Sequence, residues 1–277
     1  MVSVWVVILM LFLIIPVLMM ISSTFKYYFR IYSYLAYLML LATVLIPWCL
    51  VMSGGRSINN MRYVRAVMRQ VKYVYGLKME VEGEENFQVE GPYVVISNHQ
   101  SSIDMMGLME VLPDRCVQIA KKELMYAGPV GMILYLVGVI FINRKRTTDA
   151  KNALDEAVQT ILKDQVRVWV FPEGTRNHGG DLLPFKKGAF HLAVQAQVPI
   201  IPVVYSSYYS FYSKKEKRFS TGNIKIRILP KIDTQGLSTD DIPELLEKSY
   251  SVMKEAFWEI SGHLKNANTN NAAACST

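Results

Sequence analysis

Apolar residues dominate the start of the chain and fall into two runs. Residues 2–21 form an uninterrupted apolar run, close to the ~20 residues that a membrane-spanning helix needs. A second apolar run covers residues 31–52, and the connecting segment carries Lys26 and Arg30, the only charged residues before position 53. The pattern predicts a two-helix membrane anchor within residues 1–56, either a hairpin that spans the bilayer or a shallower pair embedded in one leaflet.

Residues 57–79 combine a helical period with a basic face. Their apolar positions recur every three or four residues, at Ile58, Met61, Val64, Val67, Val71 and Val74. Another face of the same helix carries Arg62, Arg65, Arg69 and Lys72. We expect a basic amphipathic interfacial helix on an anionic membrane surface, although the pattern fits a helix packed against the protein equally well. Because these basic residues follow the second apolar run, the positive-inside rule places the rest of the chain in the cytosol.

From residue 80 onward, short apolar strands alternate with helical patterns. The expected strands are 92–97, 116–121, 139–143, 166–171, 200–204 and, at an edge of the sheet, 223–229. The expected helices are 101–111, 130–137, 147–163, 187–197 and 239–260. This alternation is typical of an α/β fold with a mainly parallel sheet flanked by helices, which we place at residues 80–264. The Asn- and Ala-rich tail, 265–277, is expected to be disordered.

The composition restricts the partners and cofactors that we expect. The net charge of +7 suits an anionic membrane surface or a phosphate-bearing substrate, but it is too weak to indicate nucleic acid, so we expect no nucleic-acid partner. The three cysteines are far apart and odd in number, as expected for free thiols in a reducing compartment. The four histidines are isolated from one another, so we expect neither a bound metal nor another cofactor.

The tract N-H-Q-S-S-I-D at 98–104 follows a predicted buried strand. In open α/β sheets, ligands gather beyond the carboxyl ends of the strands, which is where His99 would lie. Asp104 is expected in the first turn of the next helix, where its carboxylate can fix the imidazole tautomer and leave the other ring nitrogen free as a general base. The alternative is that Asp104 only caps the helix, because Ser101 and Asp104 also match a capping box.

A second tract, F-P-E-G-T-R-N at 171–177, follows another predicted strand. Gly174 lets the backbone approach a ligand closely, and the planar guanidinium of Arg176 offers a fork of donors for two phosphate oxygens. Further cations follow other strands or lie in the next loop: Lys121, Lys122, Arg144, Lys186 and Lys187. For most of these lysines a solvated position is the commoner case. The tract predicts an anion site.

Several well-known catalytic motifs do not occur in the sequence. It contains no G-x-S-x-G elbow, no G-x-x-x-x-G-K-[ST] loop and no G-x-G-x-x-G tract. A covalent serine hydrolase, an ATPase and a Rossmann dehydrogenase therefore lose support.

Four blocks resemble, in order and in spacing, those of the glycerolipid acyltransferases. They are H-x4-D at 99–104, G-V-I-F-I-N-R at 138–144, F-P-E-G-T-R at 171–176 and V-P-I-I-P-V at 198–203. The first block alone is a weak signal, whereas four ordered blocks are specific, and the two N-terminal apolar runs extend the likeness to most of the chain.

The resemblance implies roles for particular residues. His99 looks like the general base and Asp104 like its orienting partner. Glu173, Gly174, Thr175 and Arg176 resemble the acceptor-binding block, with Arg176 on the phosphate; the other implied phosphate cations are Arg144 and Lys121. Family membership also implies acyl-CoA as the donor and co-substrate. For a eukaryotic member it implies the endoplasmic reticulum membrane, with the catalytic domain facing the cytosol.

The reaction that the resemblance implies is acyl transfer from acyl-CoA to the sn-2 hydroxyl of lysophosphatidic acid. The product is phosphatidic acid, a precursor of phospholipids and triacylglycerols, and acceptor and product both reside in the lipid bilayer. Three alternatives stay open: an acyltransferase that remodels another lysophospholipid, a membrane-anchored lipid-phosphate binding protein without catalysis, and a hydrolase whose base activates water.

Overall fold

The computed structural model describes residues 4–143 and 147–262. Its centre is a seven-stranded sheet with the strand order β1-β9-β6-β2-β5-β3-β4. The strands are β1 (Leu77–Glu82), β2 (Val94–Ser97), β3 (Cys116–Lys121), β4 (Ile140–Ile142), β5 (Arg167–Val170), β6 (Ile200–Tyr205) and β9 (Gly222–Ile228). A separate hairpin pairs β7 (Tyr212–Ser213) with β8 (Arg218–Phe219).

Most of the sheet is parallel, as predicted. Strands β6, β2, β5, β3 and β4 run in one direction, whereas β9 is antiparallel to β6 and β1 is parallel to β9. Strands β2 and β5 are direct neighbours, with Val94 opposite Val168. Their carboxyl ends therefore lie side by side, and the two motif-bearing loops that follow them meet at one edge of the sheet.

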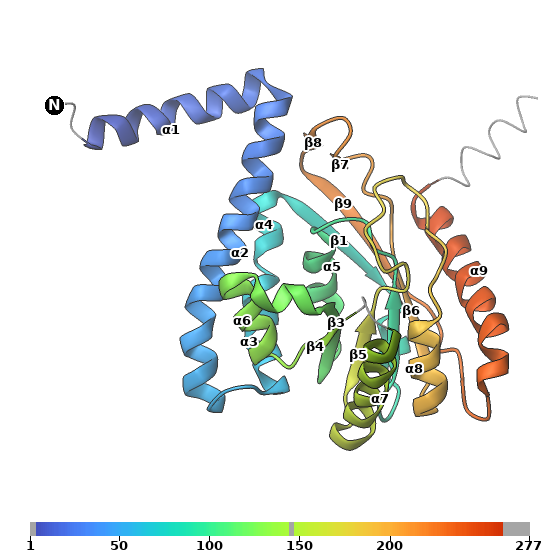
Figure 1. The fold of residues 1–277 in the computed structure, drawn as a ribbon. Coiled ribbons are helices and arrows are strands. Elements are labelled where there is room, and N and C mark those ends of the chain that lie inside the picture. The colour runs from blue at the N-terminus through green and yellow to red at the C-terminus, as the bar shows by residue number, and fades with distance from the viewer. Residues whose placement is uncertain (1–3, 144–146, 263–277) are drawn as a thin grey trace, which may run out of the picture.

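Helices cover both faces of the sheet (Figure 1). One face carries α3 (Met61–Met68), α4 (Val71–Tyr75), α5 (Asp104–Val111) and α6 (Gly128–Leu136). The other carries α7 (Thr147–Asp164), α8 (Gly188–Ala196) and α9 (Ile242–Ile260). Short 3₁₀ turns cover Ile58–Asn60, Glu84–Phe87, Lys122–Tyr126 and Thr239–Asp241. Buried apolar side chains form a separate cluster on each face, which is the layered core expected of an α/β domain.

The N-terminal apolar runs form α1 (Val4–Ile21) and α2 (Ser23–Ser53). The expected connecting segment is helical except for Ser22, whose side chain caps α2 by accepting from the Phe25 amide. In Figure 1, α1 points away from the domain, whereas α2 runs along one side of it and packs on α6 and β8. Among the described residues, α2 is the one helix long and apolar enough to cross a membrane.

Residues 57–79 depart from the continuous helix expected there. They form a 3₁₀ turn, α3, α4 and the start of β1, with Gly76 in the left-handed region at φ 63°. The basic face is turned toward α5, because Arg69 and Lys72 pair with Glu110 at 2.9 and 2.7 Å. These contacts are those of a helix that packs against the protein.

The strand 223–229 was expected at an edge, and this expectation is wrong. Strand β9 lies between β6 and β1, so β1 is the edge strand. The sequence L-K-M-E-V-E of β1 alternates apolar and charged residues, the pattern of a half-buried strand. We assigned its first half to the preceding amphipathic helix, and the expected boundary between residues 79 and 80 falls inside this strand. The expected disordered tail, 265–277, lies outside the described residues.

Candidate active site

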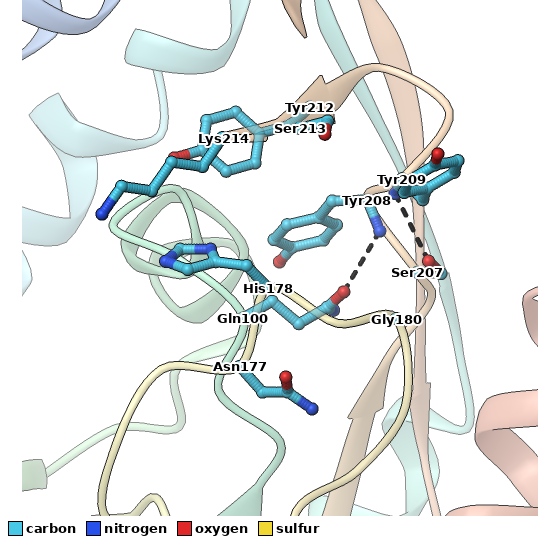
Figure 2. A pocket seen from close by; sticks show the side chains of 10 residues that line it. All are labelled: Gln100, Asn177, His178, Gly180, Ser207, Tyr208, Tyr209, Tyr212, Ser213 and Lys214. Carbon is cyan, nitrogen blue, oxygen red and sulfur yellow. Dashed lines mark hydrogen bonds between the residues drawn. The ribbon is translucent and has the colours of Figure 1, made fainter. Parts of the chain in front are cut away.

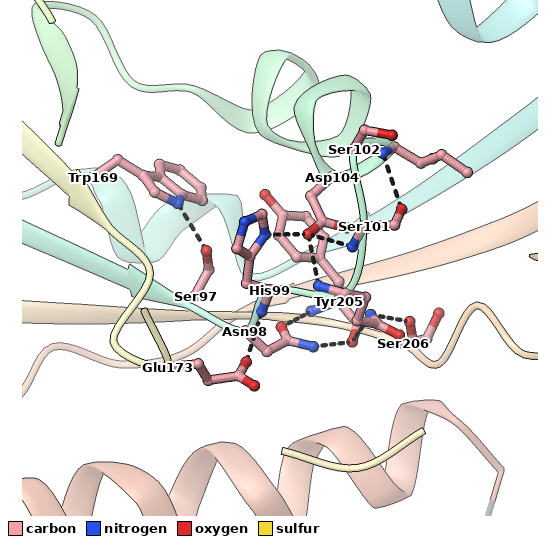
Figure 3. A network of polar contacts seen from close by, with 12 residues as sticks. Ser97, Asn98, His99, Ser101, Ser102, Asp104, Trp169, Glu173, Tyr205 and Ser206 are labelled. Carbon is pink, nitrogen blue, oxygen red and sulfur yellow. Dashed lines mark hydrogen bonds and ion pairs between the residues drawn. The ribbon is translucent and has the colours of Figure 1, made fainter. Parts of the chain in front are cut away.

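The histidine and the aspartate of the first tract are in direct contact. Strand β2 ends at Ser97, the chain turns through His99, and α5 begins with Asp104. His99 Nδ1 and Asp104 Oδ2 are 2.6 Å apart (Figure 3). The carboxylate is buried, at 1% exposure, while the imidazole keeps 20% of its side chain accessible. A hydrogen bond to the carboxylate places the ring proton on Nδ1, which leaves Nε2 free to accept a proton.

Asp104 does not cap α5, because the helix begins at Asp104 itself and its N-cap, Ile103, makes no side-chain capping hydrogen bond. Asp104 Oδ2 also accepts hydrogen bonds from the backbone amides of Gln100 and Ser101, at 2.7 and 3.0 Å. One carboxylate oxygen therefore fixes the imidazole and closes the loop that carries it. Two buried phenols lie near this charge, Tyr205 and Tyr208, and burial, followed by the charge of Asp104, raises the pKa of each well above its ordinary value.

Three residues of the second tract also contact His99: Glu173, Asn177 and Phe171. Glu173 is buried, and its carboxylate oxygens accept from the backbone amides of His99, at 2.7 Å, and Leu183, at 3.0 Å. The backbone N–H of Asn177 donates to the backbone carbonyl of His99 at 2.7 Å. The Phe171 ring stacks on the imidazole, with the two ring centroids 4.1 Å apart. Burial raises the pKa of Glu173 to about 7, against the two backbone hydrogen bonds that lower it.

Two further side chains of the first tract, which the sequence did not single out, fasten the loop to β6. Asn98 exchanges a pair of hydrogen bonds with the backbone of Tyr205, at 2.9 and 2.8 Å. Gln100 donates to the Ser206 carbonyl at 2.9 Å and accepts from the Tyr208 amide at 3.1 Å. Both side chains are buried. Their signal in the sequence was a run of amides directly after a buried strand, where backbone groups need partners.

Arg176 lies in the exposed loop after β5, near two residues that the sequence did not assign, the cation Lys214 and the imidazole of His178. His178 and Lys214 line a small polar cavity of about 20 Å³ together with Tyr212 and Gln100 (Figure 2). Burial and then the charges of Lys214 and Arg176 lower the pKa of His178. Among the described residues, neither Arg176 nor Lys214 has an ion-pair partner, and the lowered pKa leaves His178 mostly neutral at pH 7. Arg176 and Lys214 therefore leave uncompensated positive charge near the loop that carries His99.

The backbone conformation and the space at position 174 favour glycine. It has φ +69°, in the left-handed region, and an added Cβ would lie 3.0 Å from the Nζ atom of Lys186. The Lys186 side chain therefore crosses directly over the glycine of the second tract. Thr175 is exposed next to it. These positions agree with an anion site formed by this loop.

The remaining sequence candidates lie further along the same edge of the sheet. Lys121 is exposed at the end of β3, which is separated from β2 by β5. No hydrogen bond or ion pair joins it to His99 or Arg176 within the described part of the chain. Arg144 lies outside the described residues. In the segments that the structure describes, no group of three His, Cys, Asp or Glu residues is arranged to hold a metal ion.

An apolar groove opens beside Phe171. It has a volume of about 670 Å³ and runs between α7 and α8 over β3, β4 and β5. Leu154, Ala189 and Ile119 line it, and Gly174 and Lys186 stand at one end. The groove is thus mainly apolar, with Asp155, His191 and Gln195 among its polar lining residues, and Lys186 adds a cation next to the loop after β5.

Comparison with known proteins agrees with this geometry. An acyltransferase family model matches residues 78–206. The 1-acyl-sn-glycerol-3-phosphate acyltransferase alpha of Homo sapiens is 51% identical over 93% of this chain and 92% of its own length. The corresponding beta enzyme of Homo sapiens is 47% identical over 90% of each chain. The 1-acyl-sn-glycerol-3-phosphate acyltransferase of Saccharomyces cerevisiae is 38% identical over 75% of this chain and 69% of its own.

A solved structure shows the same fold. The crystal structure of the 1-acyl-sn-glycerophosphate acyltransferase PlsC from Thermotoga maritima superposes with a TM-score of 0.67 at 26% identity, covering 86% of this chain and 94% of that one. The identities and the coverage show that the chain belongs to the 1-acyl-sn-glycerol-3-phosphate acyltransferase family.

Proposed function

We propose that this acyltransferase moves an acyl chain from acyl-CoA to the sn-2 hydroxyl of lysophosphatidic acid and so forms phosphatidic acid. The observation that carries the proposal is the buried Asp104 carboxylate 2.6 Å from an accessible imidazole, near the unpaired cations Arg176 and Lys214. The relatives supply the acceptor class, because each is named for acyl transfer to 1-acyl-sn-glycerol 3-phosphate.

In the proposed reaction, His99 acts as the general base. Nε2 takes the proton of the acceptor hydroxyl as its oxygen attacks the thioester carbonyl, and Asp104 stabilises the imidazolium that forms. The tetrahedral intermediate then expels the thiolate of CoA, which receives the proton from Nε2. No acyl-enzyme forms. Acid–base catalysis of this kind contributes roughly 10²–10⁴-fold to the rate, and alignment of the two bound substrates adds to it.

Arg176 of the second tract is the group that we propose for the phosphate. Its guanidinium can contact two oxygens of a phosphate monoester, and Lys214 adds positive charge beside the imidazole of His178. A monoester carries more negative charge than a headgroup diester, so a cluster of this kind favours lysophosphatidic acid over lysolipids with diester headgroups. Glu173 contributes by position, because both of its oxygens are engaged by backbone amides.

The apolar groove beside Phe171 is the site that we propose for the acyl chain of the donor. Its volume of about 670 Å³ and its apolar lining suit a hydrocarbon chain, and the groove ends at the loop that carries Gly174 and Lys186. Leu154→Trp would shorten the available space. We expect this variant to disfavour long-chain acyl-CoA relative to short-chain acyl-CoA, and an unchanged chain-length profile would remove the groove from the donor site.

We propose that the protein works at the endoplasmic reticulum membrane with its catalytic domain in the cytosol. The apolar helix α2, the exposed apolar surface of α1 and the basic residues after residue 53 support an association with the bilayer. The acceptor and the product are membrane lipids. A catalytic site at the level of the lipid headgroups can therefore bind both while they remain in the bilayer. Protease accessibility of the α/β domain in sealed microsomes tests the orientation.

One assay decides between this reaction and its alternatives. Purified protein in lipid nanodiscs receives labelled acyl-CoA and a panel of lysolipids, and the products are identified by mass. We expect phosphatidic acid and free CoA, both dependent on lysophosphatidic acid. A preference for diester lysolipids would indicate a remodelling enzyme, release of fatty acid without acceptor would indicate a hydrolase, and no turnover would leave a binding protein.

A further inference from the structure

One tyrosine of helix α2, Tyr34, contacts the loop between His99 and Asp104. Tyr34 is completely buried, and its hydroxyl donates to the backbone carbonyl of Ser102 at 3.0 Å. The two residues are 68 positions apart in the chain. A buried phenol needs a partner for its O–H group, and here that partner belongs to the loop between His99 and Asp104.

The contact falls at a sensitive point of this loop. Ser102 directly follows the Ser101 amide that donates to Asp104 Oδ2, and it stands two residues before Asp104 itself. The Tyr34 phenol also interacts electrostatically with Asp104 and with Arg176. Tyr34 therefore lies near both the carboxylate that contacts His99 and the cation proposed for the phosphate.

The other polar contacts of this part of α2 go elsewhere. Arg30 donates to the Tyr75 carbonyl at the end of α4, with its guanidinium carbon 4.7 Å from the centroid of the Phe219 ring. Ser33 shares a hydrogen bond of 3.2 Å with the Tyr75 hydroxyl. These contacts hold α2 against α4 and β8, whereas the Tyr34 hydroxyl acts on the loop of the base.

We propose that Tyr34 is a positioning residue for the His99–Asp104 pair, and that α2 thereby couples its seating in the membrane to acyl transfer. The proposal rests on the proposed function in taking His99 as the base of acyl transfer and α2 as a membrane helix. The hydroxyl fixes the Ser102 carbonyl, which keeps the adjacent amides aimed at Asp104 and the imidazole within reach of its substrate. One side of α2 exposes Leu35, Met39, Leu40, Val44 and Trp48, so a shift of the helix in lipid moves Tyr34 and the loop with it.

The test is Tyr34→Phe, which keeps the ring and removes the hydroxyl, in full-length protein in lipid nanodiscs. We expect kcat to fall about 10-fold while the KM values for both substrates stay within about two-fold, because misplacement of the base affects the chemical step. Ser33→Ala is the matched control: it also removes one hydroxyl from α2, but one that contacts Tyr75. This control should keep the wild-type kcat.

Hydrogen exchange provides a readout that needs no substrate. The Gln100 and Ser101 amides should exchange about 10-fold faster in Tyr34→Phe than in wild type, at an unchanged melting temperature, and Ser33→Ala should leave them unchanged. An unchanged kcat with unchanged exchange at these amides would overturn the proposal, as would equal effects of the two substitutions. If the wild-type protein does not acylate lysophosphatidic acid, the proposed function fails, while exchange still decides the positioning role.

Discussion

The two halves of the site hold their charged groups in opposite ways. The base half consists of His99, Asp104 and Glu173, and its two carboxylates are 1% and 2% exposed, each bonded to backbone amides. The cation half consists of Arg176 and Lys214, with the imidazole of His178 beside them; all three are exposed, and neither cation has an ion-pair partner among the described residues. His99, Glu173 and Arg176 lie in loops that follow β2 and β5, whereas Lys214 lies in the turn of the β7–β8 hairpin.

The difference separates two tasks. Buried groups held by hydrogen bonds need little reorganisation when charge develops, so in the proposed reaction the base half suits the chemical step. Neighbouring like charges repel one another until an anion neutralises them, so the cation half suits the binding of the phosphate. Changes in the base half should therefore act on kcat and on stability, and changes in the cation half on the KM for the acceptor.

The largest effect is expected from His99→Ala. Removing the base should lower kcat by roughly 10²–10⁴-fold, because this is the contribution that general acid–base catalysis makes. The measurement is release of CoA thiol with lysophosphatidic acid, and circular dichroism checks that the variant is folded. Full activity in the folded variant would refute the assignment of the base.

Glu173→Gln tests whether Glu173 belongs with the base half, and it removes a group whose protonation depends on pH. The amide retains one acceptor oxygen and turns an N–H group toward the second backbone donor, so a buried donor loses its partner at a cost of about 1–3 kcal/mol. We expect a lower melting temperature and a lower kcat, with little change in the KM for the acceptor. A larger change in KM than in kcat would place Glu173 with the cations.

The pH effect of Glu173 has a definite sign. Its pKa is about 7 in the folded protein against an ordinary 4.5, so the native state holds a proton that the unfolded chain releases. The contribution of this group to the unfolding free energy therefore decreases as pH rises from 4.5 to 7, by at most about 3 kcal/mol. Urea unfolding of wild type and Glu173→Gln below and above this window should show the decrease in wild type only.

Arg176→Lys probes the cation half. The substitution keeps the charge and removes the planar fork, which should raise the KM for lysophosphatidic acid about 10-fold and leave kcat within a few-fold. Steady-state kinetics at a fixed concentration of acyl-CoA measure both constants. If the acceptor KM stays the same, Arg176 does not contact the phosphate.

The smallest effect is expected from Lys214→Met. This exposed lysine lines the polar cavity with His178, and its loss should raise the acceptor KM about two- to five-fold, an effect that added salt reduces by screening. Lys215→Met, on the same hairpin but outside the cavity lining, is the control and should leave KM unchanged. Equal effects of the two substitutions would indicate that Lys214 acts only through the general surface charge.

Much of this architecture follows from local patterns in the sequence. Apolar strands separated by helices predicted a mainly parallel α/β sheet, and the structure confirms it. The positions of both motif tracts after β2 and β5 also followed from the pattern, because each tract directly succeeds a buried apolar strand. The edge assignment of β9 was wrong, since the partner of this strand, β1, lies almost 150 residues away and was divided by the expected helix.

Tertiary structure alone decided which side chains meet in the site. The sequence offered Asp104 as either a cap or a partner of His99, and only the folded loop shows one oxygen that contacts the imidazole and two loop amides while α5 has no side-chain cap. It offered Glu173 as a ligand group, and the structure turns both oxygens toward backbone amides. The contacts of Tyr34 and Lys214 join distant segments. Periodicity reports which face of an element is apolar, whereas the partner of a polar group depends on three-dimensional packing that no local pattern records.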